Sequence, residues 1–257
     1  MKVERITFAG AGGQKLAARL DGPDEAPAAY ALFAHCFTCG KDVFAASRIA
    51  QQLATHRIAT LRFDFTGLGA SEGEFANTNF SSNVADLVAA AAHLQEAYMA
   101  PAILVGHSLG GAAVLSAAGQ IASCKAVVTI NAPSDAKHVS GLFKDSVPKI
   151  DADGEAEVLL AGRRFRIKKQ FLQDAAGQDL VVKIAQLRRA LLVIHSPQDD
   201  TVDISNAGKI FTAAKHPKSF ISLDKADHLL TRREDAIYAA NLIATWAARY
   251  LPAPASS

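Results

Sequence analysis

The sequence predicts an α/β fold: a mostly parallel, eight-stranded sheet flanked by helices. Short apolar runs of strand length alternate along the chain with segments of helical periodicity. Such continuous apolar strands occur where both faces of a sheet are buried. The composition, half hydrophobic and one-fifth charged over 257 residues, supplies a sizeable core. We expect a single domain over residues 1–251 and a tail or linker remnant at residues 252–257, which contain only Pro, Ala and Ser.

The predicted elements follow one another in a simple order. Two strands joined by a Gly12-Gly13 turn predict an N-terminal hairpin. The predicted strands are 3–8, 15–20, 29–34, 58–63, 102–105, 126–130, 190–194 and 219–223. The predicted helices are 43–56, 81–98, 109–123, 204–215 and 235–251. In the last helix, the pattern predicts a buried stripe of Ile237, Ala240, Ala244, Ala247 and Leu251.

The segment from about residue 134 to residue 189 interrupts this alternation. It contains a predicted hairpin of strands 156–160 and 163–167, followed by a short helix near 169–175. Sites in parallel sheets form beyond the carboxyl ends of the strands, so we expect this insertion to be a small lid. Its basic run at 163–169 follows four acidic residues, which a hairpin would place opposite it. This favours a solvated lid surface over a site for an anionic substrate.

Charge and cysteine content exclude several classes of function. The formal net charge of +2 is too small to predict binding to nucleic acid or to a membrane surface. The N-terminus lacks the apolar run of a signal peptide, and no long uncharged apolar stretch predicts a membrane span. Three cysteines do not form a disulfide framework. These features predict a cytoplasmic protein whose partner is a small-molecule substrate. A homodimer is compatible with them.

The motif Gly106-His107-Ser108-Leu109-Gly110 marks the candidate nucleophile. It follows a predicted strand and opens a predicted helix, which is the context that Gly-x-Ser-x-Gly requires. The two glycines permit a sharp turn that holds the serine at the edge of the sheet, above a helix N-terminus. Ser108 is therefore the predicted catalytic nucleophile.

A nucleophilic serine needs a histidine base and an orienting carboxylate. Of the eight histidines, only His228 is both last in order and in the loop after the final strand. The loop after strand 190–194 contains three aspartates, and we favour Asp199 because Val202, three residues later, can anchor the loop in the core. Asp200 is the main competitor.

The oxyanion hole requires two backbone N–H donors. Leu109 follows the nucleophile and supplies one of them. The loop after strand 29–34 should supply the second, and Phe37 is its natural candidate.

These segments resemble the α/β-hydrolase superfamily over nearly the whole chain. The resemblance rests on the Ser108 motif, Asp199 and His228, on the segment His35-Cys36-Phe37-Thr38, and on the loop from Asp64 to Gly73. A narrower likeness, carried by residues 34–39 and 75–81, is to the hydrolase domain of bacterial proteins that join such a domain to an OsmC-like domain. This likeness implies that relatives of the chain carry an OsmC-like partner domain.

The pair Cys36 and Cys39 departs from the family pattern, which usually has His-Gly where this chain has His35-Cys36. A Cys-x-x-Cys spacing suits thiolate pairs in redox or metal sites. No second ligand pair accompanies it, so we favour two small residues that pack an active-site loop.

These residues predict a serine hydrolase that cleaves carboxylic esters of short to medium acyl length and needs no metal or organic cofactor. The resemblance likewise implies carboxylesterase activity. Thioesterases, peptidases and perhydrolases use the same triad and stay open as alternatives. A non-catalytic binding module and a thiol-redox accessory built on Cys36 and Cys39 are the alternatives outside that chemistry.

Overall fold

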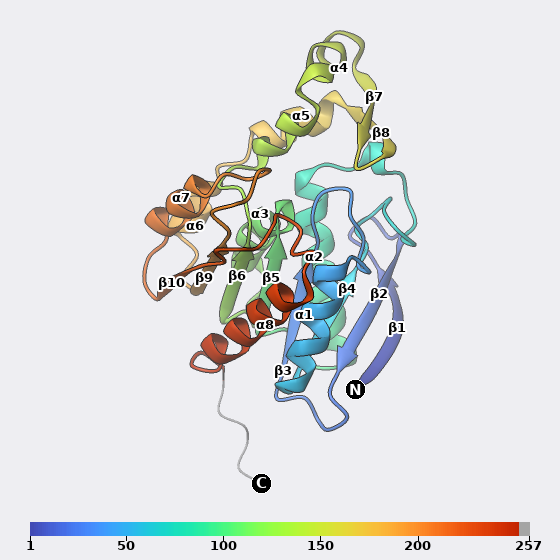
Figure 1. Ribbon diagram of the computed structural model, residues 1–257. Helices are drawn as coiled ribbons and strands as arrows, with labels where there is room; N and C mark the ends of the chain where they lie inside the picture. Colours follow the sequence, from blue (N-terminus) through green and yellow to red (C-terminus); the bar gives the residue numbers. More distant parts are fainter. Residues whose placement is uncertain (252–257) are drawn as a thin grey trace.

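A computed structural model describes residues 1–251 and confirms the α/β-hydrolase fold class (Figure 1). Its main sheet has the order β1-β2-β4-β3-β5-β6-β9-β10, and every neighbouring pair beyond β4 in that order is parallel. β1 and β2 pair antiparallel, as the predicted hairpin requires, and β2 also pairs antiparallel with β4. The strands are β1 (Lys2–Ala9), β2 (Lys15–Gly22), β3 (Ala29–Ala34), β4 (Ile58–Phe63), β5 (Ile103–His107), β6 (Ala126–Ile130), β9 (Ala190–His195) and β10 (Lys218–Ser222).

Helices cover both faces of this sheet (Figure 1). α1 and α8 pack against each other over one face, where their apolar side chains form one core cluster. α2, α3, α6 and α7 contribute to the core cluster of the other face. Their bounds are α1 (Phe44–Thr55), α2 (Phe80–Ala97), α3 (Leu109–Ala117), α6 (Leu180–Ala185), α7 (Ser205–Ala213) and α8 (Arg233–Ala247), with short 3-10 helices η1 (Phe75–Asn77) and η2 (Ala118–Gln120).

Burial along the strands follows their position in the sheet. Every residue of β3, β4, β5, β6 and β9 is buried, because helices cover both sides of these strands. At one edge, β1 buries only Ile6 and Phe8, which alternate with exposed side chains. At the other edge, no residue of β10 is fully buried. The carboxyl ends of these buried strands therefore lie away from the two edge strands, in the middle of the sheet, where a site can be enclosed.

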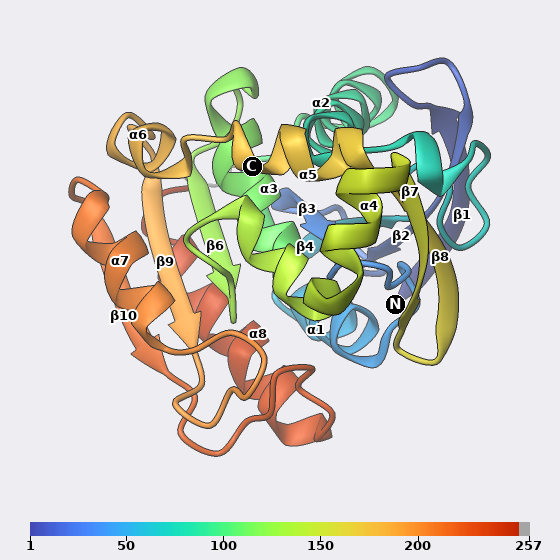
Figure 2. The same cartoon turned by 90° about the horizontal axis from the view of Figure 1, so that it is seen from above.

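The inserted segment, residues 134–189, lies over the sheet when the molecule is seen from above (Figure 2). The hairpin β7 (Glu155–Leu160) and β8 (Arg163–Lys168) and the helix α5 (Lys169–Ala176) lie within one residue of the predicted bounds. The 3-10 helix η3 (Ala136–Ser146), the helix α4 (Val147–Asp153) and the helix α6 were not predicted. The sequence shows no clear helical periodicity of apolar residues there, because η3 is kinked at Phe143 and α6 has only six residues.

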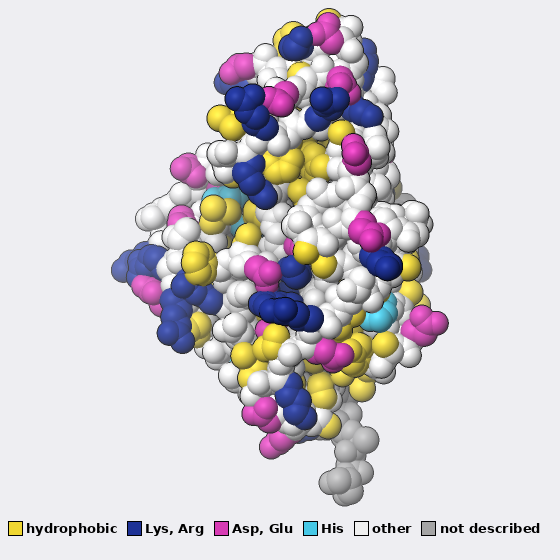
Figure 3. Space-filling view, turned by 90° about the vertical axis from the view of Figure 1, so that its right-hand side faces the viewer, with side chains coloured by type: hydrophobic (Ala, Val, Ile, Leu, Met, Phe, Trp, Pro, Cys, Tyr) yellow, Lys and Arg dark blue, Asp and Glu magenta, His cyan; other side chains and the backbone are white. Residues whose placement is uncertain are grey.

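Opposite charges face each other on the inserted segment, as the sequence predicts. Arg164 lies 2.6 Å from Glu157, and Arg166 lies 3.2 Å from Glu155 across the β7–β8 hairpin. These side chains are exposed, and basic and acidic groups intermingle at the top of the molecule (Figure 3). The basic run is therefore a solvated face in which the charges are paired.

Two predicted details of the helices are wrong. α3 ends at Ala117 and continues as η2, whereas the sequence predicted a helix to residue 123. In α8 the buried residues are Ala236, Ala239, Ala240, Ile243, Ala244 and Ala247, while Ile237 and Leu251 are only partly buried. The small alanines make the apolar face broad, so the larger Ile237 and Leu251 do not mark its centre.

Within residues 1–251, no helix combines the length and the apolar character that a membrane crossing requires. The predicted tail at 252–257 lies outside the described residues.

The N-terminus of α3 crosses β5 and β3 at close range. A Cβ added to Gly106 would lie 2.3 Å from the carbonyl oxygen of Gly110, and one added to Gly110 would lie 2.3 Å from the carbonyl oxygen of Ala34. Both obstacles are backbone atoms, which cannot swing away as a flexible side chain can. Glycine at these positions lets the helix begin directly beneath the end of β5.

We expect Gly110→Ala to destabilise the fold by more than about 3 kcal/mol, because α3 must move away from β3. The matched control is Gly208→Ala in α7, where an added Cβ meets nothing within 4 Å. It should stabilise by about 0.5–1 kcal/mol, as expected for glycine replaced within a helix. Urea unfolding of the two variants and the wild type measures both effects, and equal stabilities would contradict the close-crossing account.

Candidate active site

Ser108 occupies a strained position between β5 and α3. Its φ of 54° and ψ of −127° lie outside the regions that most residues with side chains adopt. Two hydrogen bonds hold it there: the Ser108 N–H donates to Ile130 at 2.9 Å, and the Gly111 N–H donates to the Ser108 carbonyl at 2.8 Å. The turn raises the serine side chain at the carboxyl edge of the sheet.

The structure brings Ser108, His228 and Asp199 into one hydrogen-bonded chain. His228 Nδ1 lies 2.7 Å from Asp199 Oδ2, and His228 Nε2 lies 3.0 Å from Ser108 Oγ. Because an ionised Asp199 can only accept, Nδ1 carries the imidazole proton and Nε2 accepts from the serine hydroxyl. The three residues are separated by up to 120 positions in sequence and come from three loops that follow β5, β9 and β10.

The loop after β9 selects Asp199 over its neighbours. Its second carboxylate oxygen accepts from the N–H groups of Thr201 at 2.9 Å and Val202 at 2.8 Å, and Val202 is buried as the anchor of the loop. Burial raises the pKa of Asp199, but hydrogen bonds from His228 and from these N–H groups outweigh it and hold the pKa below its usual range. Asp200 is exposed, and Asp203 accepts from Ser205 N–H beside the start of α7.

Two buried side chains that the sequence analysis did not select hold the His228 backbone. His107 Nε2 lies 2.7 Å from the His228 carbonyl oxygen, and Asn131 Nδ2 donates to the same oxygen at 3.0 Å. Burial, followed by the nearby His228, lowers the pKa of His107 to about 4, so its imidazole is neutral and its Nε2–H donates. His107 occupies an x position of the Gly-x-Ser-x-Gly motif, where any residue fits the pattern. The sequence therefore contains no indication of this role.

The loop from His35 to Val43 carries the candidate oxyanion donor Phe37. Within residues 1–251, neither the Phe37 N–H nor the Leu109 N–H donates to a backbone carbonyl outside the regular elements. The Phe37 ring points into an aromatic cluster with Phe75 of η1 and, from the inserted segment, Phe143 and Phe171, with ring centroids 5.4–6.4 Å apart. The side chain of Phe37 thus packs against the inserted segment.

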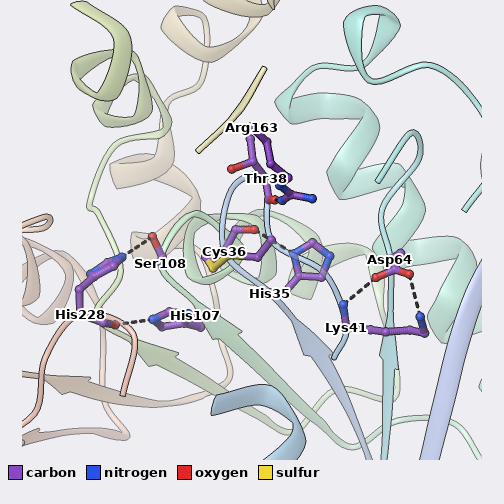
Figure 4. Close-up of a disulfide and its surroundings, with 10 residues drawn as sticks. His35, Cys36, Thr38, Lys41, Asp64, His107, Ser108, Arg163 and His228 are labelled. Atoms are coloured by element: carbon purple, nitrogen blue, oxygen red, sulfur yellow. Dashed lines mark hydrogen bonds and ion pairs between the residues drawn. A yellow bond between two sulfur atoms is a disulfide. The ribbon is translucent and has the colours of Figure 1, made fainter. Parts of the chain in front are cut away.

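Cys36 and Cys39, which the sequence analysis expected only to pack this loop, form a disulfide (Figure 4). A tight turn brings them together: the Cys39 N–H donates to the Cys36 carbonyl at 3.1 Å, and Thr38 between them has a φ of 59°. Their Cα atoms lie 5.3 Å apart, within the range that a disulfide spans. The covalent ring encloses Phe37, so it limits how the candidate donor can move.

Asp64 fixes the far end of the same loop. It is buried and accepts from the Lys41 N–H at 2.6 Å, the Lys41 ammonium at 2.8 Å and the Ala70 N–H at 3.0 Å (Figure 4). A Cβ on Gly69 would lie 2.3 Å from the Asp64 carboxylate, so this glycine is what allows the Asp64–Gly73 loop to wrap around its own aspartate. The loop that resembles the family pattern is thus the anchor of the candidate oxyanion loop.

The inserted segment also binds this loop directly. The guanidinium of Arg163, at the start of β8, donates to the Thr38 carbonyl inside the disulfide ring (Figure 4). The contact joins residues 125 positions apart, and the sequence analysis missed it because Arg163 belongs to a run of similar basic residues.

Within residues 1–251, no group of three or more His, Cys, Asp or Glu side chains could hold a metal ion. The remaining cysteine, Cys124, is buried, and burial raises the pKa of its thiol to about 12.

The sequence between residues 31 and 241 matches the model of a protein family described as the alpha/beta hydrolase family. The chain belongs to the alpha/beta hydrolase family. It is 49% identical to the esterase domain of a Rhodothermus marinus protein, with 98% of this chain and 100% of that domain covered and a TM-score of 0.81. The family assignment and the similar esterase domain support hydrolase activity.

One solved structure of lower identity shares the fold, and one curated protein matches in sequence. Est1E from Butyrivibrio proteoclasticus, solved with ferulic acid, is 19% identical with a TM-score of 0.77, and the match covers 95% of this chain and 99% of Est1E. The uncharacterized protein YfhR of Escherichia coli O157:H7 is 21% identical over 65% of this chain. That match covers 52% of YfhR, so the chain spans about half the length of the curated relatives it matches.

We expect the protonation of His107 to make the free energy of unfolding depend on pH. Its pKa is about 4 in the fold and about 6.5 in the unfolded chain, so the unfolded chain binds more protons between these values. The stability that depends on a neutral His107 is therefore fully present above about pH 6.5. As the pH falls toward 4 the free energy of unfolding decreases by about 3 kcal/mol. Urea unfolding at pH 7.5 and pH 4.5 should show a smaller loss for His107→Gln than for the wild type.

The exposed His216 provides the control, since His216→Gln should keep the pH dependence of the wild type. An unchanged pH dependence in His107→Gln would refute the assignment of this titration.

Proposed function

We propose that the protein is a serine hydrolase that cleaves carboxylic esters with short to medium acyl groups. The observation that carries this proposal is the continuous hydrogen-bonded chain from Asp199 through His228 to Ser108. In this arrangement His228 Nε2 takes the proton of Ser108 as its oxygen attacks the ester carbonyl. Asp199 keeps the imidazole in the tautomer that can accept this proton and stabilises its charged form.

The developing oxyanion lies between the N–H groups of Leu109 and Phe37 in this proposal. Leu109 is the first residue of α3, so its N–H has no partner inside the helix and points out of its positive end. Phe37 lies on the loop that the disulfide, Asp64 and Arg163 hold in place. Donors that are fixed before the reaction need no reorganisation when charge develops, which is the source of their effect on the rate.

His228 returns this proton to the leaving alcohol, which completes the transfer of the acyl group to Ser108. In the second half of the reaction His228 takes a proton from the water molecule that attacks the acyl group, and gives it to Ser108 Oγ as the acid leaves. The inserted segment acts as a lid in this scheme, because its aromatic side chains pack against Phe37 beside the serine and exclude water there. The esterase domain that is 49% identical to this chain supports an ester substrate over the alternatives with the same triad.

Three further expectations remain predictions from the sequence: a cytoplasmic location, a small-molecule ester as the partner rather than nucleic acid or membrane, and relatives that carry an OsmC-like domain.

We expect Ser108→Ala to abolish labelling by a fluorophosphonate probe and to lower kcat for p-nitrophenyl acetate by roughly 10⁴-fold or more. Asp199→Asn should lower kcat about 10³–10⁴-fold, because the amide can donate to Nδ1 and so favours the wrong tautomer of His228. The matched control Asp200→Asn changes an exposed neighbour and should stay within about twofold of the wild type. Labelling or ester hydrolysis that survives Ser108→Ala would refute the proposal.

A further inference from the structure

The carboxyl end of β6 lies among the segments that carry the three candidate catalytic residues. The strand order in this part of the sheet is β5-β6-β9-β10, and Ser108, Asp199 and His228 follow β5, β9 and β10 (Figure 1). Since β6 and β9 lie between β10 and β5, the loop that carries His228 must extend past both strand ends to reach Ser108. A contact from the end of β6 can support the loop along this path.

Asn131, the first residue after β6, joins two of these segments through its side-chain amide. Its Oδ1 accepts from the Ser196 N–H at 2.9 Å, in the loop that carries Asp199. Its Nδ2 donates to the His228 carbonyl at 3.0 Å and to the Asp227 carbonyl at 3.3 Å. One planar amide therefore bridges the loop of the acid and the loop of the base.

The backbone on either side of Asn131 holds the third segment and the end of β9. The Ile130 carbonyl accepts from the Ser108 N–H at 2.9 Å, and the Asn131 N–H donates to the Ile194 carbonyl at 3.0 Å. Asn131 has a φ of 48°, in the left-handed region that asparagine adopts more readily than most residues with side chains. The end of β6 is thus in contact with the segments of all three candidate catalytic residues.

The Asn131 amide is fully buried, and its groups are paired. A buried amide costs free energy unless its donors and its acceptor have partners, which Asn131 finds in the two loops. Ser196 Oγ also donates to the Ala226 carbonyl, so the same two loops meet at a second point. Hydrogen bonds of this kind fix the distance between two loops more narrowly than apolar packing does.

The bond from Asn131 acts on the same residue that carries the candidate base. The His228 carbonyl accepts from Asn131 and, at 2.7 Å, from His107 Nε2 (Figure 4). The imidazole of His228 lies 2.7 Å from Asp199 and 3.0 Å from Ser108. A small shift of the His228 backbone would lengthen these ring contacts, and misplacement of about 1 Å can lower a rate about 100-fold.

We propose that Asn131 is a positioning residue that sets the spacing between Asp199 and His228, and through it the contact of His228 with Ser108. The inference rests on the proposed function, in which these contacts transfer the proton. The partners of the Asn131 amide are backbone groups and not the reacting atoms. Its loss should therefore slow turnover without weakening substrate binding.

The first test is Asn131→Gly, which removes the amide and keeps a residue that tolerates the left-handed backbone. We expect kcat for p-nitrophenyl acetate to fall about 10- to 100-fold, while KM stays within about twofold of the wild type. The value of kcat is counted per site that a fluorophosphonate labels to completion, so that unfolded protein does not contribute. Asn131→Ser, whose hydroxyl is one bond shorter and has one donor, should change kcat in the same direction and serves if the glycine variant does not fold.

Asn206 in α7 provides the matched control, because it is also a buried asparagine whose amide bonds to backbone groups. Its Oδ1 accepts from the Ser134 N–H at 3.1 Å, and its Nδ2 donates to the Asp203 carbonyl at 2.9 Å. Asn206→Ala, with alanine because this position is helical, should keep kcat within about twofold of the wild type. An equal loss of kcat in the Asn131 and Asn206 variants would mean a general loosening of the fold and would overturn the proposal.

The second test observes the bond between Asp199 and His228 without turnover. In protein with ¹⁵N-labelled histidine, the proton on Nδ1 of His228 should resonate far downfield, because it is bonded to a carboxylate. Its disappearance in His228→Gln assigns the signal. We expect Asn131→Gly to move this signal upfield or to broaden it through faster exchange, and Asn206→Ala to leave it in place. An unchanged signal in Asn131→Gly would show that Asn131 does not set this spacing.

The two tests separate the positioning role from the proposed function. If the wild type hydrolysed no ester and Asn131→Gly still altered the Nδ1–H signal, the esterase function would fail and the positioning role would stand. If the wild type hydrolysed esters and Asn131→Gly matched Asn206→Ala in both kcat and the signal, the function would stand and the positioning role would fail.

Discussion

The close crossing of α3 over β5 and β3 is the constraint on which the candidate site depends. Ser108 can adopt its left-handed backbone there only because Gly106 and Gly110 leave room for two carbonyl groups. That same turn places the serine oxygen 3.0 Å from His228 Nε2 and starts α3 directly after the serine. The chemistry of the site is thus a consequence of backbone packing before any side chain is considered.

The candidate oxyanion loop shows how an irregular segment can be as well fixed as a strand. Its own disulfide and three side chains from distant parts of the chain hold it: the carboxylate of Asp64, the guanidinium of Arg163, and Arg62, which donates to the Lys41 carbonyl and pairs with buried Asp21 at 2.7 Å. Asp64 and Arg62 are charged and buried, where charge-assisted hydrogen bonds are stronger than in water. The loop therefore owes its order to tertiary contacts and not to local propensity.

The sequence predicts the parts of this protein that follow from local pattern and chain order. The fold class and the buried strands were predictable because apolar runs such as 29–34 and 58–63 match β3 and β4 residue for residue. The positions of Ser108, Asp199 and His228 at strand ends also followed from that order, and the structure places them within hydrogen-bond distance. The disulfide, the bond from Arg163 to Thr38 and the support of His228 by His107 were not predictable. The last two join residues more than 100 positions apart, and the disulfide depends on a turn that only the folded loop imposes.

Phe37 has two separate parts in the proposed function, since its N–H is the candidate oxyanion donor and its ring belongs to the aromatic cluster with the inserted segment. The N–H group is common to every residue except proline, so its electrostatic contribution is independent of the side chain that position 37 carries. The ring can therefore be replaced by a smaller apolar group, which opens space beside the inserted segment, without removing the candidate donor. Under the proposed function, position 37 is therefore a place where the size of the site can be changed independently of its electrostatics.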